Sequence, residues 1–225
     1  MLLNGFMTLR GNFSMRKHWF LGLCVISFFV SLYFIVKMPE VVPIHWNSQG
    51  QVDGYGSRWT YLISALLPVG TYLGMGVTRK IDPKQKQLNR NPQVYEFFRC
   101  LLSVFMIVMN SITILSVYNH RIDISLVMSL MIGLLMIIMG NYMPRIPQNY
   151  FLGVRFPWAI DNEYVWNKTQ RMGGYCFVVS GLMMIICGVV KPEYLVWVAL
   201  AVVILDVVAM AIYSYQIYKK VKGNE

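Results

Sequence analysis

The stretch WFLGLCVISFFVSLYFIV at residues 19–36 decides the fold class, because it contains no Asp, Glu, Lys, Arg or His. A helix needs roughly 20 mostly apolar residues to cross the hydrocarbon core of a bilayer. No small-x-small cleavage site follows the run, and further apolar runs come after it, so it is not a cleaved signal peptide. We interpret it as the first transmembrane helix.

Five more apolar runs follow, at residues 59–77, 97–118, 124–142, 175–190 and 194–215. Each run is continuous, whereas a membrane β-barrel would show ten-residue segments of alternating polarity. The sequence therefore predicts an all-α polytopic membrane protein with six transmembrane helices.

The composition agrees with this fold class. The chain has 225 residues, of which 56% are hydrophobic and 13% charged, and its mean hydropathy is +0.50. Soluble domains are about 25% charged, and disordered chains are poor in apolar residues. These values exclude an ordinary soluble protein and a disordered one, and six spans leave little length for a separate soluble domain.

The net charge of +10 could indicate nucleic-acid binding, but its distribution favours a membrane explanation. If the N-terminus is cytoplasmic, all Lys and Arg residues fall on the cytoplasmic side except Lys37, Arg58, Arg121 and Lys191. Positive charge on the inner loops is the strongest orientation signal of membrane proteins. We therefore expect both termini in the cytoplasm, contact with the lipid bilayer and no direct contact with nucleic acid.

The domain organisation that we expect is simple. The segment MRKHWF beginning at Met15 is typical of a natural start, so residues 1–14 form an N-terminal extension. Residues 15–225 form a single six-helix membrane domain, with an outer loop at 37–58 and an inner loop at 143–174. The four cysteines lie in or beside apolar runs without a CxxC pair, which favours buried free thiols. We expect no cofactor and no metal site.

The outer loop, MPEVVPIHWNSQGQVDGYGSRW with its flanks, is rich in turn-forming residues. Turns are expected at Asn47–Gly50 and at Asp53–Gly56, so the loop should be a compact cap. It serves either as a recognition surface or as a structural lid over the first two helices. Metal binding through His45 would need more ligands than Asp53 and Glu40 provide.

The inner loop should begin where the fourth helix ends, at Pro144. Pro147 and Gly153 should keep the following segment extended or turned. Asp161 is a suitable N-cap for a helix that starts at Asn162 and joins the fifth span. The loop is either an interfacial elbow that turns the chain or a site for a partner or for catalysis.

Asp206 lies in the middle of the sixth run. A charged carboxyl near the bilayer centre costs about 2.5–3.5 kcal/mol on insertion scales, so it needs a partner, a proton or water. The carboxyl either joins helices by hydrogen bonding or serves a proton, ion or substrate route. Candidate partners are the polar residues of the third run, Ser103, Asn110, Ser111 and Thr113.

Gly70 and Gly74 form a GxxxG motif in the second run, which favours close helix packing. Pro68, in the same run, is the only expected break in a span. Transporters usually show matched broken helices in two repeated halves. A transporter therefore stays an alternative of lower weight.

Evidence for catalysis is weak. The sequence contains no Walker loop, HExxH, GxSxG or Rossmann fingerprint. Asp161 and Glu163 are two positions apart and would not share a helix face. An intramembrane aspartyl protease would need a second intramembrane aspartate besides Asp206. We therefore expect that the protein is not an enzyme, with a membrane enzyme of unassigned substrate as an alternative.

The two loops resemble a known family. The outer segment, with its proline, proline–apolar–histidine and following asparagine, glycine and aspartate, resembles the N-terminal module of the SdpI family of bacterial membrane proteins. The inner segment GNYMPRIPQNYFLGVRFPWAIDNEYVWNKTQRMGGY resembles the family's second signature, NYF-x-G-x-R-x-PW followed by a helix with VW-x-KT. The resemblance covers roughly residues 38–190. One departure is Gln170, where the family pattern has a histidine.

The resemblance implies a membrane immunity protein of a Gram-positive bacterium that protects its cell from a secreted toxic peptide. Some family members also relay the presence of toxin to a cytoplasmic repressor. The residues expected to meet the toxin are those of the outer loop, Pro43, His45, Trp46, Asn47, Gly50, Asp53 and Tyr55. The residues expected to act in a cytoplasmic relay are Asn149, Gly153, Arg155, Pro157, Trp158, Trp166 and Lys168. The intramembrane polar candidates are Asn110 and Asp206.

Overall fold

The computed structural model describes residues 13–119, 122–190 and 194–223. Most of the expected N-terminal extension, residues 1–12, lies outside the described residues. Within these residues, six helices are long and apolar enough to cross a membrane, which confirms the predicted fold class. They are α1 (Phe13–Lys37), α2 (Tyr61–Ile81), α4 (Pro92–Tyr118), α5 (Ile124–Tyr142), α7 (Glu163–Val190) and α8 (Leu195–Lys222).

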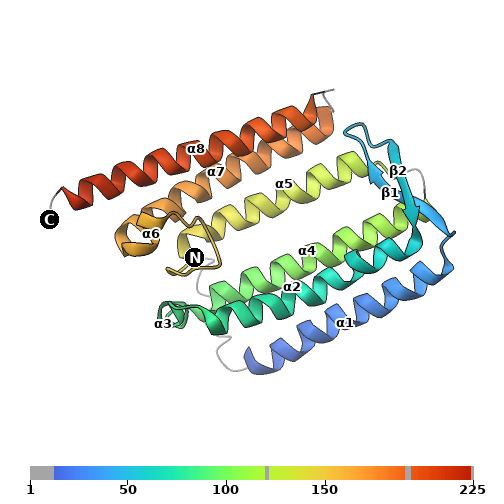
Figure 1. The fold of residues 1–225 in the computed structure, drawn as a ribbon, viewed down its shortest axis with the longest axis horizontal. Helices are drawn as coiled ribbons and strands as arrows, with labels where there is room; N and C mark the ends of the chain where they lie inside the picture. Colours follow the sequence, from blue (N-terminus) through green and yellow to red (C-terminus); the bar gives the residue numbers. More distant parts are fainter. Residues whose placement is uncertain (1–12, 120–121, 191–193, 224–225) are drawn as a thin grey trace, which may run out of the picture.

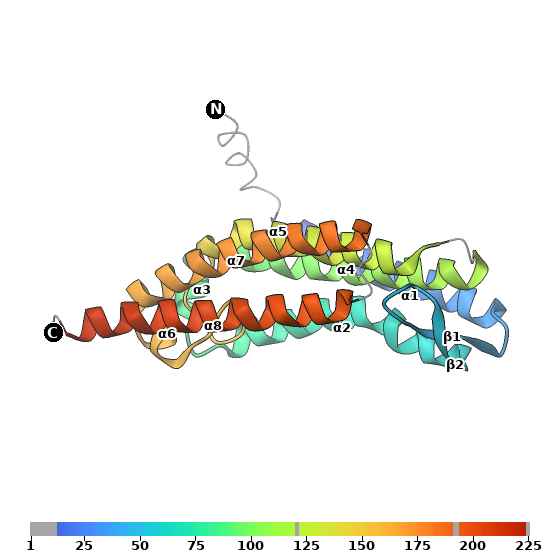
Figure 2. The same ribbon diagram turned by 90° about the horizontal axis from the view of Figure 1, so that it is seen from above.

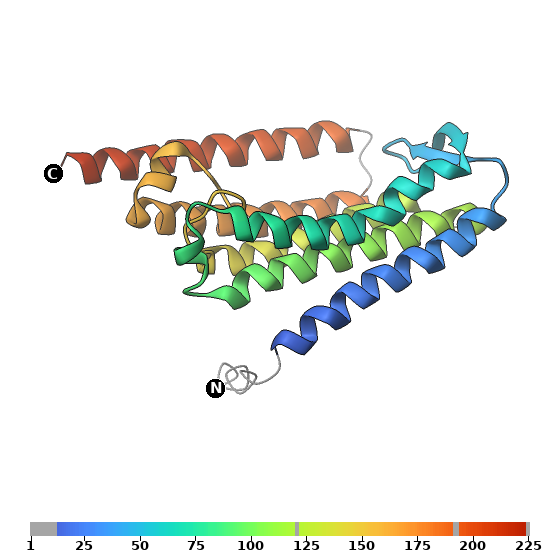
Figure 3. The same ribbon diagram turned by 60° about the horizontal axis from the view of Figure 1, so that its bottom comes forward.

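The six long helices lie roughly side by side and form an elongated bundle (Figure 1). One end carries a β-hairpin of β1 (Val41–Trp46) and β2 (Val52–Ser57), followed by the short helix η1 (Arg58–Thr60). The other end carries the short helices α3 (Gln85–Leu88) and α6 (Pro157–Asp161), as the view from above also shows (Figure 2). α8 lies on one side of the bundle and α1 on the opposite side (Figures 1 and 3).

Local sequence explains several helix boundaries. α4 begins with Pro92, which suits the first helical position because the missing N–H needs no partner there. α5 begins after Asp123, whose side chain accepts a hydrogen bond from the backbone N–H of Leu126 at 3.1 Å. α2 continues through Pro68, so the expected break in this span is wrong. Membrane helices tolerate proline when neighbouring groups satisfy the freed backbone.

The first half of the bundle consists of α1, α2, α4 and the hairpin, and polar side chains join its helices. Asn110 of α4 is buried; its amide donates to the Ser31 hydroxyl of α1 at 2.7 Å and accepts from the Ser64 hydroxyl of α2 at 2.9 Å. Nearer the α3 end, buried Glu96 pairs with Arg79 at 2.6 Å and with Arg99 at 3.2 Å. Charged groups in membrane helices need such partners, so these bonds hold α2 and α4 together.

The second half consists of α5, α7, α8 and residues 143–162, which connect α5 to α7 and which we call the platform. Here α5 and α7 make the most extensive contact of the molecule, through glycines at matched spacing. A Cβ atom at Gly181 would lie 2.5 Å from the carbonyl oxygen of Gly133. A Cβ at Gly174 would lie 2.6 Å from that of Gly140. Only glycine permits such backbone approach.

The GxxxG prediction for α2 is wrong in this structure. A Cβ atom at Gly70 or Gly74 would meet no atom within 4 Å. The close packing occurs instead in α5 and α7, where the glycines recur every seven residues on antiparallel helices. The spacing within one sequence run therefore does not identify which glycines face a neighbour.

The two halves meet at the ends of the bundle. Around the platform, a buried cluster combines residues of both halves, among them Leu88, Tyr95, Phe98, Ile146 and Trp166. At the hairpin end, the Ser125 hydroxyl of α5 donates to the carbonyl of Ser48 in the hairpin turn at 2.7 Å. The hairpin and the platform therefore bridge the halves as well as closing the two ends.

Candidate functional site

The hairpin is the first candidate region, and it confirms the expected compact cap in a different form. Asn47–Gly50 is a turn, in which the Asn47 side chain accepts from the backbone N–H groups of Gln49 and Gln51, each at 3.0 Å. The turn expected at Asp53–Gly56 is wrong, because these residues belong to β2. Along Val52–Ser57, half-buried residues alternate with exposed ones. Gly54 and Gly56 leave room for the side chains of His45 and Ile44 on β1.

All seven predicted recognition residues lie on this hairpin, and three of them, His45, Asp53 and Tyr55, are exposed. His45 and Asp53 face each other across the strands, with Nδ1 and Oδ1 2.5 Å apart and both side chains open to solvent. Tyr55 is 65% exposed. The remaining candidates play a more structural part: Pro43 gives its carbonyl to the Tyr61 hydroxyl at 2.6 Å, and Gly50 adopts a positive φ of 78° in the turn.

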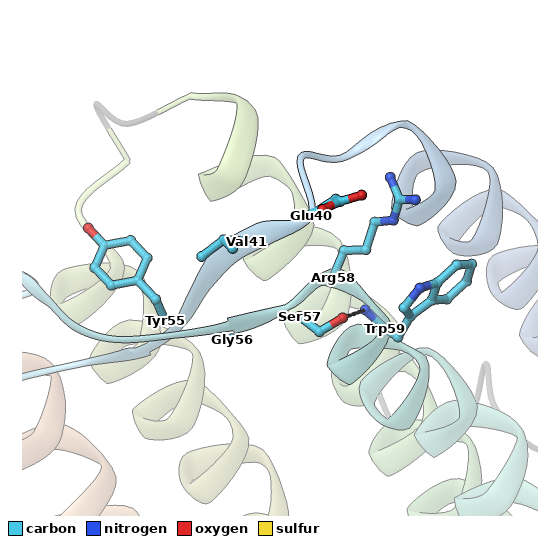
Figure 4. A pocket seen from close by; sticks show the side chains of 7 residues that line it. All are labelled: Glu40, Val41, Tyr55, Gly56, Ser57, Arg58 and Trp59. Atoms are coloured by element: carbon cyan, nitrogen blue, oxygen red, sulfur yellow. Dashed lines mark hydrogen bonds between the residues drawn. The ribbon is translucent and has the colours of Figure 1, made fainter.

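A hollow of about 510 Å³ lies along β2 and η1. Figure 4 shows Tyr55 at one end of this segment and Trp59 at the other, with Val41 on the neighbouring strand. Glu40 and Arg58 add one charge of each sign to the lining. The prediction from sequence included only Tyr55 of these residues. The alternation of Val52, Gly54 and Gly56 with exposed polar residues was the available signal for a strand.

Arg58 also ties the two ends of the loop together. Its Nη1 donates to the carbonyl oxygens of Val36 at 3.2 Å and of Met38 at 2.8 Å, where α1 ends. A positive charge at the C-terminus of α1 interacts favourably with the dipole of that helix. Its Nε is buried and is the one buried side-chain nitrogen or oxygen without a hydrogen-bond partner among the described residues.

The platform is the second candidate region, and the side chain of Asn149 holds its loop in place. Asn149 is fully buried. Its amide donates to the carbonyls of Pro147 and Leu152, and its oxygen accepts from the N–H groups of Phe151 and Leu152, at distances from 2.6 to 2.9 Å. All its hydrogen-bonding capacity is thus used inside the loop, so Asn149 fixes the fold of the loop.

Other predicted relay residues are also structural. Trp166 is fully buried, and its indole N–H donates to the Ile146 carbonyl at 2.8 Å. Gly153 has a φ of 94°, which only glycine adopts readily. A Cβ there would also lie 2.5 Å from Oε1 of Gln170.

Gln170, the departure from the family pattern, has a clear place in this structure. It is fully buried. Its oxygen accepts from the Val154 N–H at 3.1 Å, and its amide nitrogen donates to the Val154 carbonyl at 2.8 Å. A planar amide satisfies both backbone groups of one residue, so Gln170 ties α7 to the platform.

The exposed part of the platform is smaller than the sequence suggested. Arg155 and Pro157 are exposed, and Arg155 donates to the Tyr150 carbonyl at 2.8 Å. Trp158 stacks on Phe156 and donates to the Ser214 hydroxyl of α8 at 2.9 Å. Lys168 is half-buried, with its ammonium 5.5 Å from the centre of the Tyr164 ring.

The helix after the platform starts one residue later than expected. Asp161 is the last residue of α6, so the predicted N-cap is wrong. Asn162 takes that role, because its side chain accepts from the backbone N–H of Val165 at 3.1 Å. α7 then continues from Glu163 into the fifth span without a break, as expected.

Sequence reasoning missed two residues that hold the platform, Asp82 from the segment after α2 and Gln148 from within the platform. Asp82 is buried and accepts from the backbone N–H groups of Lys84 at 2.7 Å and Tyr150 at 2.9 Å. Gln148 donates to the carbonyl of Ile160 at 2.7 Å. Both lie next to a proline, but a contact between residues 82 and 150 leaves no trace in the local pattern.

Asp206 has a partner, but not the expected one. Its Oδ2 accepts from the Ser180 hydroxyl of α7 at 2.6 Å. The candidates of the third run lie elsewhere, and Asn110 joins α1, α2 and α4 instead. In the described part of the chain, no three His, Cys, Asp or Glu side chains are placed to hold a metal ion.

Comparison with known proteins agrees with these two regions. A family profile described as the SdpI/YfhL protein family matches residues 145–215, from the platform through most of α8. A second profile, described as Domain of unknown function (DUF1648), matches residues 22–68, which include the hairpin. No solved structure matches significantly.

The immunity protein SdpI of Bacillus subtilis strain 168 is 26% identical to this chain over 199 residues. The alignment covers 88% of this chain and 94% of the relative. The predicted resemblance to the SdpI family is therefore confirmed, and this chain is a multi-pass membrane protein similar to a known immunity protein.

Proposed function

We propose that this protein is a membrane immunity protein that protects its bacterial cell against a secreted toxic peptide. The observation that carries the proposal is the alignment with immunity protein SdpI, which extends through both candidate regions. Conserved architecture alone would not assign a function. The proposed role needs no catalysis and no cofactor.

The proposal requires an orientation in which the hairpin faces the outside. The charge distribution supports it, because the platform end carries most of the Lys and Arg residues. A membrane-impermeant thiol reagent should label Ser48→Cys in intact cells, and Lys84→Cys only after lysis. The native cysteines serve as the background control. Labelling of Lys84→Cys in intact cells would reverse the orientation.

Protection can be tested in Bacillus subtilis 168 from which the gene for immunity protein SdpI has been removed. These cells, with and without this chain, would be grown in medium conditioned by the parent strain and in medium conditioned by the strain from which the chain comes. We expect the chain to raise the fraction of surviving cells in at least one medium. Absence of protection in both media, at membrane levels that match SdpI in the control, would overturn the proposal.

In this proposal the hairpin binds the toxic peptide. The exposed His45–Asp53 pair and the aromatic side chains of Trp46 and Tyr55 supply polar orientation and contact area, as interface residues do. Asp53→Ala should therefore reduce protection, because it removes an exposed polar group without disturbing a buried contact. Protection equal to that of the parent chain would show that the pair is not read.

We further propose that the exposed part of the platform reports toxin to a cytoplasmic repressor. Arg155 and Pro157 support this role, because they are exposed, whereas Asn149 and Trp166 are committed to the fold. Arg155→Ala should reduce recruitment of a fluorescent repressor from a neighbouring gene to the membrane while leaving protection intact. Unchanged recruitment would remove Arg155 from the relay.

A further inference from the structure

The hairpin has two edges that differ in their capacity to bind another strand. In an antiparallel pair, hydrogen-bonded and non-hydrogen-bonded residue pairs alternate. The backbone N–H of Arg58 bonds to the Glu40 carbonyl at 3.1 Å, which sets the phase of the alternation. Val42 and Gly56 are then a hydrogen-bonded pair. Within the pairs Val41–Ser57 and Pro43–Tyr55, the two residues are not hydrogen-bonded across the hairpin. Their backbone N–H and C=O groups therefore point away from the partner strand.

The free edge of β1 is closed. Pro43 has no N–H, and its carbonyl already accepts from the Tyr61 hydroxyl at 2.6 Å. Proline on an edge strand is a common protection against pairing with another chain. A third strand therefore cannot form a regular ladder along β1.

The free edge of β2 is open. The backbone N–H and C=O of Tyr55 and the N–H of Ser57 point outward, and these three groups have no hydrogen-bond partner among the described residues. The carbonyl of Ser57 is already used, because Ser57 is the N-cap of η1 and its C=O accepts the first hydrogen bond of that helix. No proline or lysine protects this strand. Its outward groups form an alternating set of donors and acceptors that only an extended backbone can match.

The hollow described above lies beside this open edge. Three successive residues of β2, Tyr55, Gly56 and Ser57, line it, so it follows the strand. Tyr55 and Trp59 provide exposed aromatic area, and Glu40 and Arg58 add one charge of each sign to the lining. The hollow suits an apolar side chain of a bound strand.

We propose that the free edge of β2 binds an extended segment of the toxic peptide as a third strand, with one apolar side chain in the hollow. This inference rests on the proposed function and names its recognition mode. A second copy of this chain is the competing occupant. Its β2 also carries an aromatic side chain, Tyr55, so this occupant is tested directly below.

Ser57 offers a sharp test, because its φ of −68° suits proline. Ser57→Ala removes the side chain that caps η1, whereas Ser57→Pro also removes the N–H of the free edge. Neither breaks a hydrogen bond between β1 and β2. Loss of one backbone hydrogen bond corresponds to about a two- to tenfold change in affinity. We expect Ser57→Pro to lower the tolerated concentration of toxic peptide by about that factor relative to Ser57→Ala, at equal membrane levels.

Hydrogen exchange on the full chain in lipid nanodiscs gives a direct readout. The probe is the toxic peptide purified from the conditioned medium against which the chain protects. The peptide should slow exchange of the Tyr55 and Ser57 amides, while the Val42 and Gly56 amides, already bonded within the hairpin, stay unchanged. If Ser57→Pro accelerates exchange at Val42, the variant has lost the hairpin, and exchange on the unsubstituted chain decides the test.

Three results would overturn the inference in distinguishable ways. If the chain protects but the exchange at Tyr55 and Ser57 is unaffected by the peptide, the edge is not the site and the proposed function stands. If Tyr55→Cys forms a disulfide-linked homodimer and these amides are slow before peptide is added, a second copy occupies the edge. If the chain protects in neither medium, the proposed function fails and the inference fails with it.

Discussion

The helices α1, α2 and α4 of the first half and the pair α5–α7 of the second half are held together by different kinds of contact. In the first half, α1, α2 and α4 are joined by side chains that hydrogen-bond or form ion pairs, such as Asn110 with Ser31 and Ser64. In the second half, α5 and α7 approach each other backbone to backbone through glycines. The comparison teaches that apolar runs of similar composition can pack by opposite means, and each means predicts its own response to substitution.

The same contrast holds for the two loops. The hairpin exposes the polar side chains His45 and Asp53 at its surface, whereas the platform buries Asn149 and Gln170 and satisfies them within the protein. Both segments look like loops in sequence, because the hairpin is rich in glycine, the platform is rich in proline, and both contain aromatic residues. A loop that uses its polar groups internally is a scaffold, and a loop that leaves them exposed is available to a ligand.

The largest effect should come from a glycine of the second half. Gly181→Leu places a side chain against the backbone of α5, which cannot move aside without separating the helices. Overpacking of this kind costs about 3 kcal/mol. Denaturation in mixed detergent, followed by circular dichroism, would measure the loss. Gly74→Leu is the matched control in the first half, and we expect it to change the free energy of unfolding by less than about 0.5 kcal/mol. Equal effects of the two variants would contradict the difference between the halves.

The next effect compares the loops through two asparagines. Asn149→Ala leaves buried backbone groups of the platform without partners and should cost about 2–3 kcal/mol. Asn47→Ala removes two bonds in a half-buried turn, where water can replace them, and should cost about 1 kcal/mol. Thermal unfolding of the detergent-solubilised variants would compare them. A larger loss for Asn47→Ala would mean that the hairpin, not the platform, is the scaffold.

A smaller effect is expected for the polar junction of the first half. Asn110→Val removes the bonds to Ser31 and Ser64 and keeps the volume of the side chain similar. Hydrogen bonds between membrane helices contribute about 0.6 kcal/mol on average, so the loss should be about 1 kcal/mol. The same denaturation experiment measures it. A loss as large as that of Gly181→Leu would show that polar contacts dominate both halves.

The smallest effect should come from Asp206. Asp206→Asn keeps an acceptor for the Ser180 hydroxyl, so stability should change by less than about 0.5 kcal/mol and protection against the peptide should remain. Asp206→Leu leaves Ser180 without this partner and should cost about 1 kcal/mol. If Asp206→Asn abolished protection at a normal membrane level, a proton or ion route would replace the structural role.

Local patterns were sufficient to predict the framework of the fold. The run at 124–142 coincides with α5, and the other runs lie within or close to their helices, because bilayer burial demands continuous apolar length. Contacts between distant residues could not be predicted in this way. The partner of Asp206 lies in α7, and the bond from Tyr150 to Asp82 joins segments far apart in the chain.

The candidate site was predicted in outline. The resemblance indicated two segments, which the structure places at opposite ends of the bundle, and the expected outer residues all lie on the hairpin. The strand at Val52–Ser57 was missed because Asp53, Gly54 and Gly56 are individually turn formers, while their alternation becomes meaningful only with β1 beside them. Burial separated the relay candidates, since Trp166 and Arg155 have equal standing in a sequence motif but opposite exposure in the structure.

Because the glycines are spaced seven residues apart, the interface between α5 and α7 is compatible with two registers. Sliding α7 by two turns, about 10 Å, would place Gly181 against Gly140 and Gly188 against Gly133, again with glycine facing glycine. The glycine contacts alone therefore do not determine the register of α7 relative to α5. The bonds of Trp166 to Ile146 and of Gln170 to Val154 choose it, because they fix the start of α7 to the chain that has just left α5. In this protein the platform, which connects α5 to α7, determines the axial position of α7 relative to α5.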